Sequence, residues 1–150
     1  MKVLGIDQAS HTGYAVVCDD ELIDSGTQVF KGHVGKRISE FATWLRLKLQ
    51  SELPDLVVYE RPHFRGYAAT LSGVGMIATI LAVCYEFGVR AVDVHTATLK
   101  KFATGYGRAS KSMMTGAANR AEGLKLNTKE NNDEADAIHL ALYGSTYING

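Results

Sequence analysis

Two short apolar runs that each end in an acidic residue constrain the fold of this chain most strongly. The first is Val3-Leu4-Gly5-Ile6 followed by Asp7, and the second is Leu56-Val57-Val58-Tyr59 followed by Glu60. Runs of this length between turn residues are typical of buried strands. A carboxylate at the point where such a strand leaves the core needs a cation or several donors to offset its desolvation. The rest of the sequence must therefore supply a partner for Asp7.

The order of the predicted elements indicates one mixed sheet. Two strands follow the first one through short turns, which makes the three antiparallel neighbours. A crossover helix joins the last two strands, which makes those two parallel. The predicted strands cover about 3–7, 13–18, 22–30, 56–60 and 89–94. The predicted helices cover about 35–50, 68–87, a short stretch between Thr96 and a loop at 105–107, 110–122, and a segment capped by Asn131 or Asn132. We expect an α/β fold with a five-stranded sheet and helices on both faces.

Length and composition favour a single folded domain over residues 1–150. Apolar residues make up 46% of the chain and charged residues 21%, and no repeat or low-complexity tract divides it. Cys18 and Cys84 lack the spacing of a zinc site or a disulfide framework. We also expect no leader sequence and no membrane span. These features favour a reducing cytoplasm.

Charge is unevenly distributed although the net charge is zero. Residues 1–60 hold six Lys/Arg and nine Asp/Glu, residues 61–129 hold ten and three, and residues 130–150 hold none and four. The three segments are therefore −3, +7 and −4. This separation favours a basic face for a polyanion such as DNA, although a solvated basic face without a partner explains the same numbers.

A second pair of acids completes a possible metal site. Asp133 and Asp136 stand three residues apart in a predicted helix and so project from one side. If this helix crosses the adjacent ends of two parallel strands, the four acids Asp7, Glu60, Asp133 and Asp136 converge. Hard oxygen ligands without Cys or His suit Mg²⁺ or Mn²⁺. Two such ions support phosphodiester hydrolysis.

Each acid also has a purely structural explanation. Asp7 could form a turn, Glu60 could pair with Arg61, and acids in the first turn of a helix are stabilised by its dipole. Four buried like charges are much harder to explain by stability alone. A lone helical histidine is usually a surface or core residue, so His139 is left out of the predicted catalytic set, as are His11 and His95.

The acidic motifs resemble those of the RuvC-type Holliday junction resolvases, which have a ribonuclease H-like fold. The matching segments are Leu4-Gly5-Ile6-Asp7 with Thr12-Gly13-Tyr14, Val58-Tyr59-Glu60, Asp133-Glu134-Ala135-Asp136-Ala137 and the basic segment 107–111. The resemblance runs along nearly the full chain. One difference is that many cellular members have Asp-Pro-Gly where this chain has Asp7-Gln8-Ala9, so a phage-type relative is a plausible source.

This resemblance implies a homodimeric, Mg²⁺-dependent crossover junction endodeoxyribonuclease that makes paired nicks in four-way DNA junctions. It implies that Asp7, Glu60, Asp133 and Asp136 hold two metal ions, with Mn²⁺ able to replace Mg²⁺, and that Lys111 acts near the scissile phosphate. The expected location is the cytoplasm of a bacterial cell or a phage-infected host. No membrane association is implied.

The basic middle of the chain supplies the predicted DNA contacts. Cations and aromatic side chains in one loop can hold phosphates and stack on unpaired bases. The predicted contacts are Arg61, Phe64, Arg65, Tyr67, Lys100, Lys101 and Arg108. Phe64 and Tyr67 could instead pack in the core or in a dimer interface.

Three other functions remain open from the sequence. A nuclease of the same fold could act on RNA/DNA hybrids, flaps or forks, because acids of this kind bind phosphates and not bases. A non-catalytic junction-binding module would bind without metal and would not cut. A sugar kinase or actin-like ATPase would need two such domains, whereas 150 residues supply only one.

Overall fold

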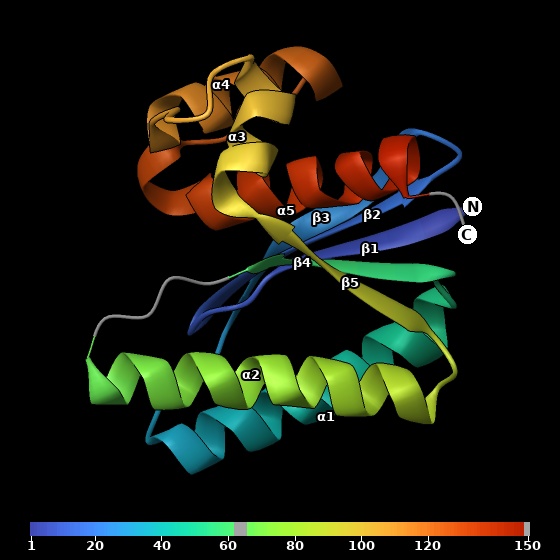
Figure 1. Cartoon of the computed structure of the whole chain (residues 1–150), viewed down its shortest axis with the longest axis vertical. Helices are drawn as coiled ribbons and strands as arrows, with labels where there is room; N and C mark the ends of the chain where they lie inside the picture. Colours follow the sequence, from blue (N-terminus) through green and yellow to red (C-terminus); the bar gives the residue numbers. More distant parts are fainter. Residues whose placement is uncertain (62–65, 149–150) are drawn as a thin grey trace.

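The computed structural model describes residues 1–61 and 66–148, except for the side chains of 67–69. Five strands form one sheet in the order β3-β2-β1-β4-β5, as Figure 1 shows. The strands are β1 (Lys2–Asp7), β2 (His11–Cys18), β3 (Glu21–Val29), β4 (Leu56–Arg61) and β5 (Arg90–His95). The first three are antiparallel, and β4 runs parallel to both β1 and β5. The predicted mixed sheet is confirmed.

The turns of the sheet explain these pairings. Asp19 and Asp20 join β2 to β3 with φ values of 49° and 68°, the left-handed geometry that suits a tight hairpin. The β1–β4 pairing aligns Ile6 with Tyr59, so Asp7 and Glu60 leave the sheet at the same edge. This edge is where parallel strands bring their carboxyl ends together.

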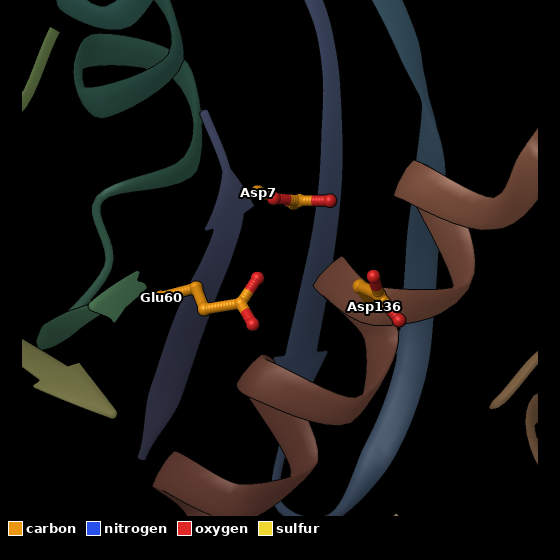
Figure 2. Close-up of side chains that lie close together, drawn as sticks. All are labelled: Asp7, Glu60 and Asp136. Carbon is orange, nitrogen blue, oxygen red and sulfur yellow. The ribbon is translucent and has the colours of Figure 1, made fainter. Parts of the chain in front are cut away.

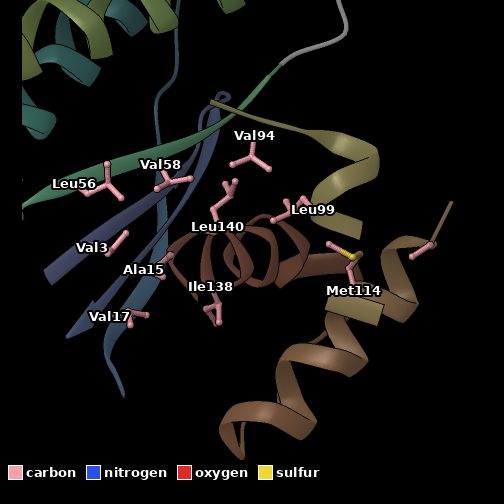
Figure 3. Close-up of a cluster of buried hydrophobic side chains, with 13 residues drawn as sticks. Val3, Ala15, Val17, Leu56, Val58, Val94, Leu99, Met114, Ile138 and Leu140 are labelled. Carbon is pink, nitrogen blue, oxygen red and sulfur yellow. The ribbon is translucent and has the colours of Figure 1, made fainter. Parts of the chain in front are cut away.

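Helices cover both faces of the sheet (Figure 1). One face carries α1 (Val34–Glu52) and α2 (Tyr67–Glu86), and the other carries α3 (Thr96–Thr104), α4 (Lys111–Glu122) and α5 (Thr128–Tyr147). Each face has its own apolar cluster. On the α5 face, strand residues such as Val3 and Val58 pack with Leu99, Met114 and Leu140 (Figure 3). On the other face, Phe41, Leu45, Met76 and Ile80 pack against the sheet.

Two glycines let α5 lie directly on the sheet. A Cβ atom added at Gly5 would meet the carbonyl oxygen of Ala137 at 2.3 Å, and one added at Gly13 would meet the carbonyl oxygen of Asp133 at 1.9 Å. Both neighbours are backbone atoms, so any side chain here would push the helix outward. The glycines of the first two strands therefore set how closely the acidic helix approaches Asp7.

The start of α5 differs from the prediction. Asn127, and not Asn131 or Asn132, caps the helix by accepting hydrogen bonds from the N–H groups of Lys129 and Glu130. Asn131 has non-helical angles (φ −121°, ψ 18°) and kinks the helix. Its Oδ1 accepts from the N–H of Asn127 at 3.0 Å. Asparagine side chains compete for nearby backbone groups in this way, so the predicted cap at Asn131 or Asn132 is wrong by four or five residues.

The cysteines, the helices and Gly75 give three smaller observations. Both cysteines are free, and burial raises the pKa of Cys84 to about 12. None of the helices in the described part of the chain combines the length and apolar character that a membrane span requires. Gly75 packs against α1, where an added Cβ would meet Ile38.

Candidate active site

Three acids from three different elements meet at the carboxyl edge of the sheet. Asp7 ends β1, Glu60 lies near the end of β4, and Asp136 lies on α5 five residues after the kink at Asn131. One carboxylate oxygen from each lies within 4.8 Å of the others. Figure 2 shows the three carboxyl groups directed into a common space. The predicted convergence of both strand ends with the last helix is therefore what the structure contains.

Asp133 lies at the side of this trio. It is not among the three residues whose oxygens share the 4.8 Å limit. Its carboxyl group nevertheless interacts with that of Asp7 through a hydrogen bond and through charge repulsion. Asn132 Nδ2 donates to Asp133 Oδ1 at 3.4 Å, which gives this carboxylate a donor that the trio lacks. Asp133, the fourth predicted acid, is therefore linked to the trio by its interaction with Asp7.

Burial and mutual repulsion raise the pKa values of the central acids. Desolvation is the main cause at Asp7, followed by repulsion from Asp136, Glu60 and Asp133, and it lifts the pKa of Asp7 well above its usual value. The same two causes, led again by desolvation, raise the pKa of Asp136 to about 7. Carboxylates held so close together cannot all ionise without a compensating positive charge. The three carboxylates could therefore hold a cation.

Two lysines bring positive charge to the rim of the pocket. Lys100 of α3 and Lys111 of α4 both lower the pKa of Asp136, although by less than burial raises it. Lys111 is the first residue of α4, directly after the capping residue Ser110, whose hydroxyl accepts from the N–H of Met113. Lys100 was predicted only as a DNA contact, but it lowers the pKa of Asp136 just as Lys111 does.

Two further contacts hold the pocket in shape. His139 is 2% exposed, and its Nε2 lies 2.9 Å from the carbonyl oxygen of Met114, which ties α5 to α4. Burial lowers the pKa of this histidine, and the residue lies in the core beside α4. The buried Thr12 hydroxyl donates to the Ala9 carbonyl at 2.6 Å and fixes the turn that follows Asp7.

Comparison with known proteins finds relatives along nearly the whole chain. A protein of Halorhodospira halophila named crossover junction endodeoxyribonuclease RuvC is 30% identical over 148 residues, which cover 94% of this chain and 87% of the relative. A protein of the same name from Gloeobacter violaceus is 27% identical over 155 residues, which cover 96% and 87%. The chain belongs to the RuvC family.

Solved structures agree on the fold, although no family model matches the sequence. The RuvC of Thermus thermophilus in complex with Holliday junction substrate superposes with a TM-score of 0.85 at 22% identity, covering 99% of this chain and 94% of that one. The yeast mitochondrial Holliday junction resolvase Ydc2 gives a TM-score of 0.66 at 14% identity, covering 95% and 77%. The ribonuclease H-like fold predicted for a RuvC-type chain is confirmed.

The predicted DNA contacts of this RuvC-family chain differ in their surroundings. Arg61 is exposed, and its Nε donates to Asp93 at 2.8 Å. The alternative pairing of Arg61 with Glu60 is therefore not what the structure shows. Lys101 and Arg108 are exposed, and Lys101 lines an aromatic cavity of about 450 Å³ with Phe102, Tyr143 and Tyr147. Phe64 and Arg65 lie outside the described residues, as does the side chain of Tyr67.

Sequence reasoning missed the role of Gln8, which replaces the proline of the Asp-Pro-Gly motif. The Nε2 of Gln8 donates to the carbonyl oxygen of Glu60 at 2.9 Å. This bond joins the end of β1 to the end of β4, directly beside two of the central acids. The Oε1 of Gln8 is buried without a partner in the described structure. The departure from the RuvC motif was visible in the sequence, but the partner across the sheet was not.

Proposed function

We propose that this protein is a Holliday junction resolvase, an endodeoxyribonuclease that nicks four-way DNA junctions with the help of divalent metal ions. The observation that supports it best is the acidic trio of Asp7, Glu60 and Asp136, which a RuvC-family chain assembles from three elements. Two lysines border the same pocket. Residues 1–150 would act as one nuclease domain, because both apolar cores are built on the same sheet.

The donor set of the pocket fits Mg²⁺ or Mn²⁺. All three groups are carboxylates, their oxygens lie within 4.8 Å of one another, and the described residues place no thiol or imidazole in the trio. Hard divalent cations bind such oxygen ligands, and the raised pKa values of Asp7 and Asp136 mark charge that the protein itself does not neutralise. Asp7, Glu60 and Asp136 would hold the metal, with Asp133 completing a site for a second ion. When bound, two divalent ions lower the pKa of water and stabilise the charge of a phosphodiester under attack.

The remaining residues position the DNA. Lys100 of α3 and Lys111 of α4 both act on the pKa of Asp136, and their ammonium groups would hold the oxygens of the scissile phosphate. In the reaction, the oxygen of water bonds to phosphorus, one bridging P–O bond breaks, and the departing oxygen takes up a proton. Gln8 keeps the strand ends in register, so that Asp7 and Glu60 meet without rearrangement.

We further propose that the enzyme is a homodimer joined through α2. Five residues of this helix form an exposed stripe at alternating spacings of three and four: Leu71, Val74, Ala78, Leu81 and Tyr85. The four larger ones are 45%, 49%, 48% and 88% exposed. A continuous apolar stripe of this kind suits a two-fold helix pair. Paired nicks require two active sites, which such a dimer supplies.

A substrate panel tests the proposed function. Labelled four-way junction, fork, flap and RNA/DNA hybrid are incubated with Mg²⁺, beside the Asp7→Asn variant. Asp20→Asn is the matched control, because it makes the same chemical change in the β2–β3 turn at the opposite end of β1. Preferred cleavage of the junction that is lost only in Asp7→Asn supports the proposal. Junction binding without any cleavage would indicate a non-catalytic module, and preference for the hybrid would indicate a different nuclease.

A further inference from the structure

A basic loop leads from β3 into α1 within an otherwise acidic part of the chain. Residues 31–37 contain Lys31, Lys36 and Arg37, and no acidic residue occurs between Asp24 and Glu40. These three residues are half of the six Lys/Arg in residues 1–60. Neither the family motifs nor the basic region from 61 to 129 includes them. A local concentration of positive charge in a segment of net charge −3 requires its own explanation.

The loop lies at the same edge of the sheet as the acidic pocket. Val29 pairs with His11 across the sheet, and the N–H of Phe30 donates to the carbonyl oxygen of Ser10 at 2.8 Å. Ser10 is three residues beyond Asp7. Figure 1 shows the start of α1 on the side of the molecule where β1 turns into β2. The helix that follows the loop, α1, covers the face of the sheet opposite to α3 and α4, which carry Lys100 and Lys111.

The positive charges of the loop are largely unneutralised by the protein. Lys31 is exposed and forms no ion pair with any described residue. Lys36 lies 3.5 Å from Glu40 in a pair whose side chains are 53% and 47% exposed, and exposed pairs of this kind are weak. Arg37 also lacks an acidic partner among the described residues, and its buried Nε has no acceptor. Lys31 is therefore fully available to a ligand, and Lys36 is held only by a weak exposed pair.

The backbone of the loop adds donors suited to an anion. His33 caps α1 by accepting from the N–H of Lys36 at 3.2 Å. The N–H groups of Val34 and Gly35 begin the helix and have no acceptor in the described part of the chain. Gly32 has φ of 105°, which a residue with a side chain rarely adopts. A Cβ atom added at Gly32 would meet Lys36 Cδ at 2.9 Å, so the glycine lets the Lys36 side chain lie against the loop, beside the positive end of the helix.

We propose that residues 31–37 form a second phosphate-binding surface, which holds the backbone of a DNA arm on the side of the acidic pocket opposite to Lys100 and Lys111. This inference rests on the proposed junction-cutting function, since the loop and the acids lie at the same edge of the sheet. The contacts are to phosphates, so they contribute affinity and position without reading sequence. Two basic surfaces on either side of the pocket would fix the scissile strand between them.

The test measures binding in a protein that cannot cut. In the Asp7→Asn background, the dissociation constant of a labelled four-way junction is determined in EDTA at several NaCl concentrations. The test variant is Lys31→Ala/Lys36→Ala, whose residues are exposed and make no buried contact. The matched control is Arg46→Ala/Arg90→Ala. This control variant also removes two positive charges. Arg46 pairs with Glu86 at the far end of α2, and Arg90 is the first residue of β5.

The expected result is a loss of affinity and of salt dependence in the test variant alone. The logarithm of the association constant falls as log[salt] rises, and each lost phosphate contact should make this slope shallower by about 0.9. Each lost contact should also weaken binding roughly five- to tenfold at 0.1 M salt. Linear duplex should be affected in the same way. If test and control variants bind with the same constant and slope, the second surface is refuted and the resolvase proposal stands. If the Asp7→Asn protein binds no junction at all, both proposals fail together.

Discussion

Replacing Asp136 with asparagine should stabilise the metal-free protein while abolishing cleavage. The carboxyl of Asp136 has its pKa raised to about 7, first by burial and then by repulsion from Glu60 and Asp133. A raised pKa in the folded state means that the fold prefers the protonated form. The contribution of this group to stability is therefore intact below about pH 4, declines as the pH rises from 4 to 7, and is lost above 7.

The size of the effect follows from the shift. The pKa of Asp136 is about 3 units above its ordinary value of 3.8, and each unit corresponds to about 1.4 kcal/mol, so ionisation costs the metal-free fold about 4 kcal/mol above pH 7. At pH 5 the same reasoning gives about 2 kcal/mol, because only the unfolded chain is then ionised. An asparagine with an unpartnered amide in this pocket costs about 1–3 kcal/mol. The net gain should be about 1–3 kcal/mol at pH 8 and close to zero at pH 5.

Urea unfolding in EDTA at pH 5 and pH 8 measures this difference. Thermal melting should show the same trend, because 1 kcal/mol shifts the melting temperature of a chain of this length by about 2–4 °C. Asp20→Asn is the control, since Asp20 lies in the exposed β2–β3 turn and asparagine tolerates its left-handed geometry. If Asp136→Asn lowers the free energy of unfolding equally at both pH values, ionised Asp136 does not destabilise the metal-free fold. The electrostatic account of the pocket would then be wrong.

Three further outcomes follow from the same geometry. Mg²⁺ should raise the melting temperature more at pH 8 than at pH 5.5, because protons compete with the metal for Asp7 and Asp136. Equal shifts at both pH values, or a shift that survives Asp136→Asn, would contradict this. Gly13→Ala should destabilise the protein by about 1–3 kcal/mol in urea unfolding and reduce cleavage, because the new methyl group meets the backbone of α5; unchanged stability would show that α5 can move freely. Gln8→Ala should cost about 1 kcal/mol and lower kcat more than junction affinity, since it releases the carbonyl of Glu60; a change in affinity alone would assign Gln8 to DNA contact.

Local patterns were sufficient to predict the sheet and most of the helices. The apolar runs around Leu4 and Val57 are short and sharply bounded, and the parallel pairing of their strands follows from the crossover between them. The position of the last helix start could not be predicted in the same way. Both Asn127 and Asn131 can accept a hydrogen bond from a nearby N–H, and only the packing of α5 decides between them.

The candidate site was predictable in its acids but not in the contacts that hold them. Asp7 and Glu60 could be found because each follows a buried strand whose end the parallel pairing brings to one edge, and Asp136 because it shares one side of a predicted helix with Asp133. Lys100 could not be ranked beside Lys111, because the packing of α3 against the pocket has no local sequence signal. The bond from Gln8 to Glu60 spans 52 residues of sequence, and no periodicity reports on such a pair.

The glycines show why this pocket depends on the whole sheet. Gly5 and Gly13 occupy adjacent strands and both face α5, so their missing side chains allow the helix backbone to approach the strands directly. Asp133 and Asp136 extend from this helix, which means that the separation of helix and sheet sets the spacing of the carboxylates. The resulting repulsion destabilises the metal-free fold, as the raised pKa values of Asp7 and Asp136 indicate. The apolar contacts of Ile138, Leu140 and Ala141, which are fully buried on the same helix, offset that repulsion and keep the acids together.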